Sequence, residues 1–268
     1  MLTKLRFSLF TPQHSSLIHS PIPPFHVSFT TPLSLHVATF KTSNASPLSE
    51  TTHFAQNDLF IPPGVDPEDI TPKMILPRSN IVIGPYAGDS KVNTVEFVKS
   101  SNQVKDCPKD HRPEFAVVGK TRLINHFLVN KSWYIVDLPG YGFANAPEAA
   151  KMDWFSFTKG YFLNRETLVS VLLLVDASVP PQKIDLDCAN WLGRSKIPMT
   201  FVFTKCDKMK GGKTKPDENI REFQELIRQN YKHIPPWILT SSVTGLGRDG
   251  LLLHMSQLRN YWDSDSAD

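Results

Sequence analysis

Four short runs of residues combine the side chains and backbone groups that bind phosphate, a divalent cation and a purine base. Each run directly follows a short apolar stretch, as happens where a buried strand ends in a functional loop. In chain order the runs are Gly119-Lys120-Thr121, Asp137-Leu138-Pro139-Gly140, Thr204-Lys205-Cys206-Asp207 and Thr240-Ser241-Ser242. Loops at the carboxyl ends of parallel strands meet along one edge of the sheet, so we expect the four runs to form a single site.

The run from Asp137 to Gly140 has the pattern D-x-x-G. An aspartate at a strand tip can hold Mg²⁺ through water, and the backbone N–H of a glycine three residues later can approach a γ-phosphate. The same pattern also occurs in ordinary turns. It therefore predicts a nucleotide site only together with the other runs.

The run from Thr204 to Asp207 suits a guanine base. The carboxylate of Asp207 can accept hydrogen bonds from two donors on the guanine edge, and the aliphatic stem of Lys205 can cover the ring plane. The small residues from Thr240 to Ser242 leave room for backbone N–H groups beside the base carbonyl. Such a triplet alone is most often a solvent loop, but the order D-x-x-G, T-K-x-D, S-S predicts a guanine-nucleotide site.

Short branched or aromatic runs predict the strands that position these loops, and amphipathic segments between them predict helices. The expected strands are 115–118, 133–136, 169–175, 199–203 and 237–239, and the expected helices are 147–164, 181–192, 217–231 and 250–262. Residues 94–99 are expected to form a helical turn. The alternation predicts an α/β fold with a doubly wound, mostly parallel sheet and one antiparallel edge strand.

Composition places the chain among globular proteins. It has 268 residues and is 40% hydrophobic, with 5 Trp and 17 Phe, which is enough for a substantial core. No apolar run reaches the roughly 18 residues of a membrane span. The 3 scattered cysteines favour neither a disulfide framework nor a metal cluster and indicate a reducing compartment. The formal net charge of +3 leaves about +1 beyond residue 50, so global charge gives no sign of nucleic-acid binding.

The N-terminal segment has the composition of a targeting sequence. Its first acidic residue is Glu50, and the residues before it are rich in Ser, Thr, Pro and His. Residues 1–50 are therefore predicted to be an organelle transit peptide, for the chloroplast because of the prolines, with the mitochondrion as the alternative. A merely disordered tail is the other interpretation. Residues 51–93 are predicted to be a Pro-rich linker or loosely attached extension, 94–262 the folded domain, and 263–268 a tail.

The chain resembles the EngB (YihA-type) GTPases of the TrmE–Era–EngA–EngB superfamily, in their plant organellar branch. The resemblance rests on W-Y-I-V-D-L-P-G-Y-G-F-A at 133–144 together with the other three runs, and it covers about residues 94–262. It implies a Ras-like P-loop GTPase fold and a monomeric protein that binds GTP or GDP with Mg²⁺. It also implies a role in large ribosomal subunit assembly, with ribosomal RNA or an assembly intermediate as partner, and in bacteria a role in division septation.

The resemblance also assigns roles to residues. Metal contact falls on Thr121 and Asp137. Nucleotide contact is expected from Gly119, Lys120, Thr121, Arg122, Leu123, Asp137, Leu138, Pro139, Gly140, Thr204, Lys205, Cys206, Asp207, Thr240, Ser241 and Ser242. No catalytic base is assigned, because Tyr141 stands where Ras-like enzymes place a glutamine to orient the attacking water.

The G-K-T run has two interpretations, the end of a phosphate-binding P-loop or the switch segment that carries a second such run in this family. Only residues 122–136 separate Thr121 from Asp137. A P-loop threonine would need a helix, a switch loop and two strands in that interval, and a helix alone takes about 11 residues. A hairpin does fit, with strands 123–129 and 132–136 joined by a turn at 130–131. The run therefore belongs to the switch.

By this interpretation the chain lacks the P-loop and the first helix. A segment of roughly 25–30 residues, close to one supersecondary unit, is missing between Val118 and Lys120. Phosphate binding then loses its backbone cradle and its lysine, so we predict weak or absent GTP binding and negligible hydrolysis. The sheet face that the first helix would cover is expected to expose an apolar patch of several hundred Å².

Two alternatives stay open beside a GTP-binding protein. The chain can be a nucleotide-independent interaction module that docks on ribosomal or division partners. It can also be the product of alternative splicing or an incomplete gene model, which transcript sequencing across the codons for Val118 to Lys120 would reveal.

Overall fold

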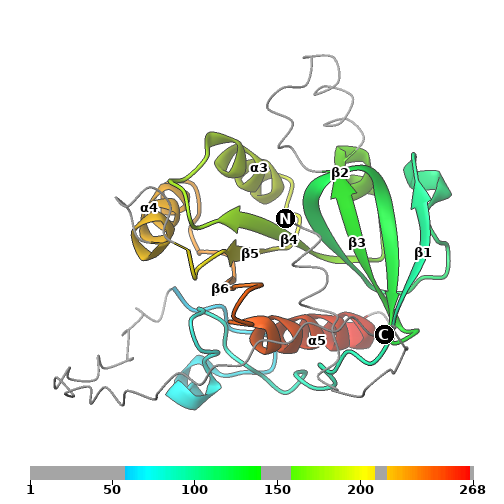
Figure 1. Ribbon diagram of the computed structural model, residues 1–268. Helices are drawn as coiled ribbons and strands as arrows, with labels where there is room; N and C mark the ends of the chain where they lie inside the picture. The colour runs from blue at the N-terminus through cyan, green and yellow to red at the C-terminus, as the bar shows by residue number, and fades with distance from the viewer. Residues whose placement is uncertain (1–57, 140–157, 209–215, 266–268) are drawn as a thin grey trace, which may run out of the picture. The chain divides into compact units, whose positions relative to one another are not determined.

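The computed structural model describes residues 58–139, 158–208 and 216–265, without the side chains of residues 119–122. Six strands form one sheet in the order β1-β2-β4-β5-β6, with β3 paired to β2 (Figure 1). The strands are β1 Val95–Ser101, β2 Glu114–Val129, β3 Trp133–Pro139, β4 Leu168–Asp176, β5 Met199–Thr204 and β6 Trp237–Leu239. The pairs β2·β4, β4·β5 and β5·β6 are parallel, which confirms the predicted fold class.

Strand β2 pairs with β3 along both of its halves. In the first half of β2, the residue numbers of the paired positions increase together along both strands, so that Phe115 lies opposite Ile135. In the second half they run in opposite directions, ending with Val129 opposite Trp133. β2 therefore arches over the end of β3 and returns along its other side, as Figure 1 shows.

The turn between β2 and β3 has the geometry predicted for the hairpin. Asn130 and Lys131 have φ angles of 49° and 57°, the pair of positive values that a two-residue type I′ turn requires. The side-chain carbonyl of Asn130 also accepts hydrogen bonds from the N–H groups of Asn93 and Thr94, at 2.8 and 3.1 Å. The predicted hairpin is confirmed, and Asn130 fastens it to the segment that leads into β1.

Residues 94–99 do not form the predicted helical turn. They belong to β1, which pairs antiparallel with the second half of β2. The open edge of β2 offers unpaired backbone groups, and pairing with them outweighs the weak local helical preference of this segment. As a result, β1 forms the edge of the sheet, and the antiparallel strand, which is the second half of β2, lies one position in from that edge.

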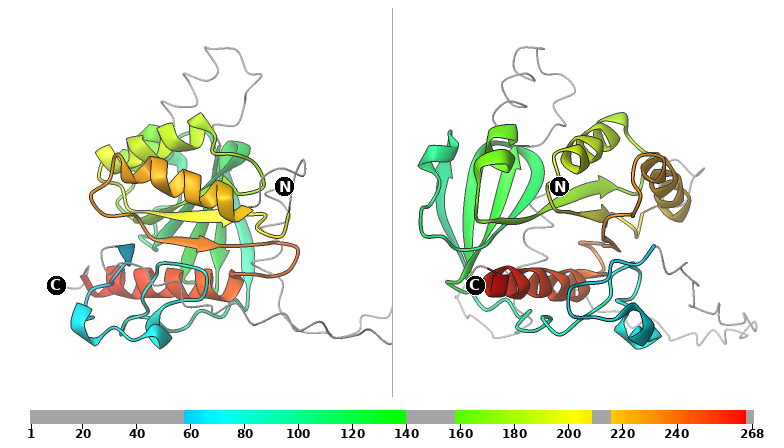
Figure 2. Two further views of the ribbon diagram at one scale, coloured as in Figure 1. Left: turned by 90° about the vertical axis from the view of Figure 1, so that its left-hand side faces the viewer. Right: turned by 180° about the vertical axis from the view of Figure 1, so that it is seen from behind.

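The helices cover both faces of the sheet. They are α3 Lys183–Arg194, α4 Pro216–Arg228 and α5 Arg248–Asp265, and residues 158–164 form a further helical segment. Short 3₁₀ helices are η2 Pro67–Asp69, η3 Pro72–Met74 and η4 Val104–Asp106. Helices α3 and α4 lie on one side and α5 on the other (Figure 2). The predicted helices are confirmed within a few residues, except that α5 runs three residues into the predicted tail and residues 147–157 lie outside the described part.

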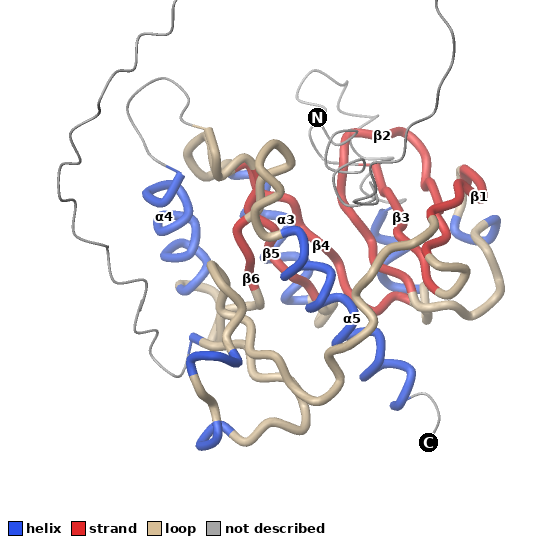
Figure 3. Tube along the Cα trace, turned by 60° about the horizontal axis from the view of Figure 1, so that its bottom comes forward, coloured by secondary structure: helices blue, strands red, loops and turns tan. Residues whose placement is uncertain are grey.

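The extension before β1 is packed against the domain. Ser79 pairs with Ile238 of β6, and the buried side chain of Asn80 accepts a hydrogen bond from the N–H of Trp237 at 2.7 Å. Farther along, the N–H of Gly84 donates to Gln257 of α5 at 2.7 Å. Figure 3 shows these loops beside α5. Residues 58–93 are thus a structured extension rather than a linker, and they cover the outer edge of β6.

The sheet face on which the apolar patch was predicted is covered over its middle and exposed toward β1. Val117 and Ile135 are 8% and 4% exposed, and they belong to a buried cluster with Val92, Leu251 and Met255. Helix α5 and the extension therefore bury this part of the face. Toward β1 the same face exposes large apolar side chains, since Phe97, which pairs with Phe127, is 59% exposed and Leu123 is 38% exposed. No described helix has the length and hydropathy that crossing a membrane requires.

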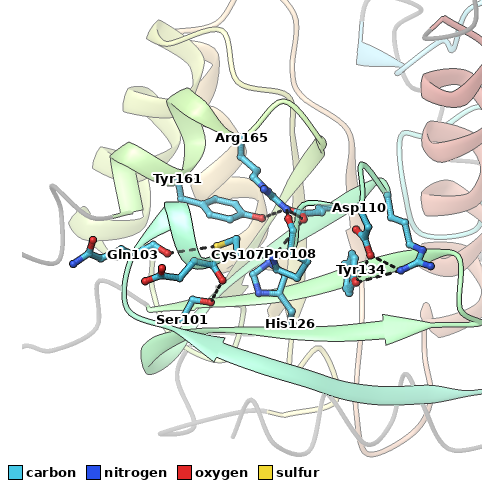
Figure 4. A network of polar contacts seen from close by, with 12 residues as sticks. Ser101, Gln103, Cys107, Pro108, Asp110, His126, Tyr134, Tyr161 and Arg165 are labelled. Carbon is cyan, nitrogen blue, oxygen red and sulfur yellow. Dashed lines mark hydrogen bonds and ion pairs between the residues drawn. The ribbon is translucent and has the colours of Figure 1, made fainter.

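A buried polar network joins the start of β2 to the loop before β4 (Figure 4). The carboxylate of Glu114 is fully buried and accepts hydrogen bonds from Arg165 Nε at 2.9 Å and Nη2 at 2.5 Å. The hydroxyl of Tyr161 donates to the same carboxylate, and Arg165 also donates to the carbonyl of Pro108. His126 on the returning half of β2 lies with its Nε2 3.8 Å from Glu114. A buried charge pair with these hydrogen bonds fixes four chain segments to one another.

Two buried histidines make the stability of the domain dependent on pH. Burial lowers the pKa of His126 and of His254 to about 3, against an ordinary value of 6.5. At acidic pH the unfolded chain then binds protons that the folded chain does not bind. The contribution of the two neutral histidines to the free energy of unfolding is therefore fully present above pH 6.5 and decreases as the pH falls toward 3. We expect the free energy of unfolding to fall by about 1.2 kcal/mol for each histidine between pH 6 and 5.

Urea unfolding at pH 6 and pH 5 would measure this slope. The variant His126→Phe should lose about half of it. An unchanged slope in His126→Phe would show that this histidine is protonated in the folded chain as well.

Candidate functional site

Two of the predicted runs lie side by side because strands β5 and β6 are parallel neighbours. Phe203 lies opposite Leu239, so Thr204 and Thr240 leave the sheet together. The N–H and the hydroxyl of Thr240 both donate to the carbonyl of Phe203, at 2.7 and 2.9 Å. The N–H of Cys206 donates back to the carbonyl of Thr240 at 3.2 Å. These bonds fix the two loops relative to each other.

The aspartate of the T-K-x-D run is held by the serine of the other loop. The hydroxyl of Ser241 donates to Oδ1 of Asp207 at 2.5 Å. The same hydroxyl accepts hydrogen bonds from the N–H groups of Val243 and Thr244, each at 3.2 Å. Asp207 is otherwise exposed, so its carboxylate is oriented and still accessible to a ligand.

The loop after Ser242 depends on a glycine. Gly247 has a φ angle of 72°, and a Cβ atom there would lie 2.0 Å from the carbonyl oxygen of Leu239. Only glycine accepts that backbone conformation and that close approach together. The N–H of Ser241 donates to the carbonyl of Leu246 at 3.0 Å, which closes the loop. Among the described residues, the N–H of Ser242 has no acceptor, and Ser242 is partly exposed.

The lysine of the run is held by a residue that the motifs did not identify. Lys205 has a φ angle of 60°, and its ammonium group pairs with the carboxylate of Asp176 at the end of β4. Asp176 in turn accepts hydrogen bonds from the N–H of Ser178 at 3.0 Å and from its hydroxyl at 2.6 Å. The position of Asp176 at a strand tip was the available signal. Its role could be assigned only once the strand order placed β4 beside β5.

The D-x-x-G run is described as far as Pro139. Asp137 is 1% exposed, and the side-chain amide of Asn125 donates to its Oδ2 at 3.4 Å. Leu138 is fully buried, so its side chain packs in the core and does not contact a ligand. Gly140 lies outside the described residues. β2 brings Gly119 and Lys120 to this tip, since both pair with Pro139.

Only some of the predicted magnesium ligands are among the described side chains. Mg²⁺ takes one or two carboxylates and completes its shell with water and substrate phosphates. Asp137 is one such carboxylate, whereas the side chain of Thr121, the other predicted ligand, is not described. Nowhere in the described residues do three His, Cys, Asp or Glu side chains gather as a metal site. Of the two predicted ligands, Asp137 is the one whose side chain is described, and it is a carboxylate of the kind that Mg²⁺ takes.

Cysteine chemistry is not favoured at this site. Cys206 lies between Lys205 and Asp207, and burial raises the pKa of its thiol to about 11. Its sulfur is 3.4 Å from the carbonyl oxygen of Phe203. The thiol is therefore neutral at physiological pH and acts as a packed side chain rather than a nucleophile.

Comparison with known proteins identifies relatives of this chain. Residues 113–205 match the family model described as a 50S ribosome-binding GTPase. A GTP-binding protein of Arabidopsis thaliana is 65% identical over 250 aligned positions, covering 83% of this chain and 83% of that protein. A probable GTP-binding protein EngB of Bacteroides fragilis is 35% identical over 201 positions, covering 65% of this chain and 99% of that protein. A crystal structure of a probable EngB protein matches with a TM-score of 0.46 at 18% identity, covering 55% of this chain and 99% of that one.

The lengths of these alignments bear on the missing segment. The Bacteroides alignment spans 201 positions, yet the 65% of this chain that it covers is about 174 residues, so about 27 positions have no counterpart here. The Arabidopsis alignment gives about 28 in the same way, from 250 positions and 83% of the chain. Both differences agree with the predicted loss of one supersecondary unit. The EngB protein of Bacteroides fragilis is 35% identical to this chain, and the alignment covers 99% of that protein. The chain therefore belongs to the EngB-type GTP-binding protein family.

Proposed function

We propose that this chain is a guanine-nucleotide-binding protein that assists assembly of the large ribosomal subunit in a plant organelle. The observation that carries the nucleotide part is the contact between Ser241 and Asp207, because it holds a carboxylate in place for the guanine edge. The ribosomal part is supported by the matching family model, described as 50S ribosome-binding. The chloroplast is the proposed location, from the composition of residues 1–50, and the mitochondrion is the alternative.

Weak binding of GTP and slow hydrolysis are part of the proposal. Support comes from the unbroken course of β2 from Glu114 to Val129, which leaves no loop or helix where a phosphate cradle would begin. In phosphoryl transfer, positioning and charge stabilisation of the phosphates supply most of the catalysis. Bound Mg²⁺ would neutralise phosphate charge near Asp137. The residues of this chain contribute recognition of the base.

Gradient sedimentation tests the ribosomal role. Full-length protein added to chloroplast extract at low Mg²⁺ should migrate with precursors of the large subunit and not with the small subunit. Asp207→Ala should weaken that association if it depends on guanine nucleotide. Residues 1–50 fused to a fluorescent protein would report the organelle, and fluorescence that stays in the cytosol would contradict the transit peptide.

A nucleotide-independent docking module is the second candidate, favoured by the same unbroken course of β2. The two candidates differ in a thermal melt with and without Mg²⁺ and GTP. A ligand that binds only the native state raises the melting temperature. Association with the ribosomal precursor together with an unchanged melting temperature would favour the docking module.

A further inference from the structure

We propose that the site recognises the guanine base and is indifferent to the phosphates, so that guanosine, GMP, GDP and GTP bind with similar affinity. This inference rests on the proposed guanine binding and specifies its ligand class. It follows from a contrast within the site, where the part that faces a base is assembled and the part that would face phosphates is replaced by strand.

The base half is complete without a ligand. Asp207 is oriented by Ser241 at 2.5 Å and exposed, which suits the ring N–H and the exocyclic amine of guanine. The N–H of Ser242, with no acceptor among the described residues, suits the base carbonyl. Adenine presents an acceptor where guanine presents a ring donor, so Asp207 would repel it. Because the hydrogen bonds in both loops already exist, little ordering is needed on binding.

The part of the site that would face the phosphates is formed by a strand rather than by a loop before a helix. A phosphate cradle needs successive backbone N–H groups that point at a ligand from a loop before a helix. Here β2 continues as a strand through Gly119 and Lys120, both paired with Pro139, and reaches Asn125 opposite Asp137. The backbone at Gly119 and Lys120 thus lies against the neighbouring strand β3. It is therefore not arranged as a phosphate-binding loop.

The charged side chains described at the strand tips do not compensate for the lack of a phosphate-binding loop. Among the described residues at the ends of β3, β4 and β5, three carboxylates face two ammonium groups. These are Asp137, Asp176, Asp207, Lys205 and Lys208. The ammonium group of Lys205 is already paired with Asp176. Added phosphates thus gain no net Coulomb attraction from these five described side chains.

Titration by NMR against guanosine, GMP, GDP and GTP, with and without Mg²⁺, tests the proposal on the full-length chain. We expect the four dissociation constants to agree within about threefold, a small difference on the free-energy scale of binding. Adenosine, as the control, should give no saturable shift. GTP binding more than about threefold tighter than guanosine would overturn phosphate indifference and leave the proposed guanine function intact. If no guanine compound binds, the proposed function fails as well.

A base swap tests whether Asp207 reads the ligand. Asp207→Asn replaces an acceptor by a donor, and xanthosine differs from guanosine by the opposite exchange. The variant should bind guanosine at least about tenfold more weakly than the parent, and xanthosine more tightly, as expected for hydrogen bonds to a charged group. Asp187→Asn on the exposed face of α3 is the matched control and should keep the parental preference. Unchanged preference for guanosine in Asp207→Asn would overturn the proposal, and the gain of xanthosine binding excludes simple misfolding.

Discussion

Inserting the missing segment of about 27 residues between Val118 and Lys120 is expected to raise the affinity for GTP by at least about a hundredfold. The segment would come from the Arabidopsis relative, whose alignment has this surplus over the present chain. It would restore a backbone cradle and a lysine, and two hydrogen bonds to charged phosphate at about 1.5–3 kcal/mol each give at least this factor. Competition titrations with GTP and guanosine would measure it.

The outcome for guanosine separates this prediction from a general gain in stability. Because the base contacts of Asp207 are already present, guanosine affinity should change little on insertion. A Gly-Ser segment of the same length is the control and should leave GTP binding as weak as in the present chain. Equal GTP affinity with both insertions would mean that the loss of this segment does not limit binding.

Arg165→Met is expected to lower the free energy of unfolding by about 3–5 kcal/mol, the usual cost of leaving one partner of a buried ion pair alone. The carboxylate of Glu114 is fully buried and would keep only the hydroxyl of Tyr161 as a donor in the network described above. Methionine replaces much of the volume of the arginine stem, so the loss reflects charge and hydrogen bonds more than a cavity. Urea unfolding at neutral pH would measure it.

The double variant is the sharper test. Glu114→Leu with Arg165→Met removes both charges, and replacing a whole buried ion pair by apolar residues is often close to neutral. We therefore expect the double variant to be more stable than Arg165→Met alone. If the effects of the two single substitutions simply add, the two side chains do not interact in the folded protein.

Local patterns in the sequence predicted most of the sheet. Val169 to Val175 and Met199 to Phe203 are runs of strand length that are apolar except for one hydroxyl residue each, and the structure extends each by one or two residues. The spacing from Thr121 to Asp137 left room only for a hairpin, and the positive φ angles of Asn130 and Lys131 match it. Periodicity and spacing are local properties, so one sequence was enough to find these elements.

What the sequence did not reveal depends on contacts between distant segments. Glu114 is a charged residue at the start of an apolar strand, which was a signal, but its partner Arg165 lies 51 residues away. Asp176 and Lys205 likewise meet only because β4 and β5 are neighbours. The extension around Asn80 contains prolines that suggested a linker, whereas pairing with β6 decided its structure. Each of these contacts follows from strand order, which local pattern does not encode.

The arch of β2 over β3 also bears on how the chain folds. Ala116 and Val136 pair although they are only 20 residues apart, and about 27 further residues in a relative would separate the same pair by about 47. The entropy of loop closure grows with the logarithm of length, so this pairing costs about 0.8 kcal/mol less here. Short sequence separation between contacting residues also favours rapid folding. We therefore expect the segment from Glu114 to Pro139 to pair before β4, β5 and β6 join the sheet.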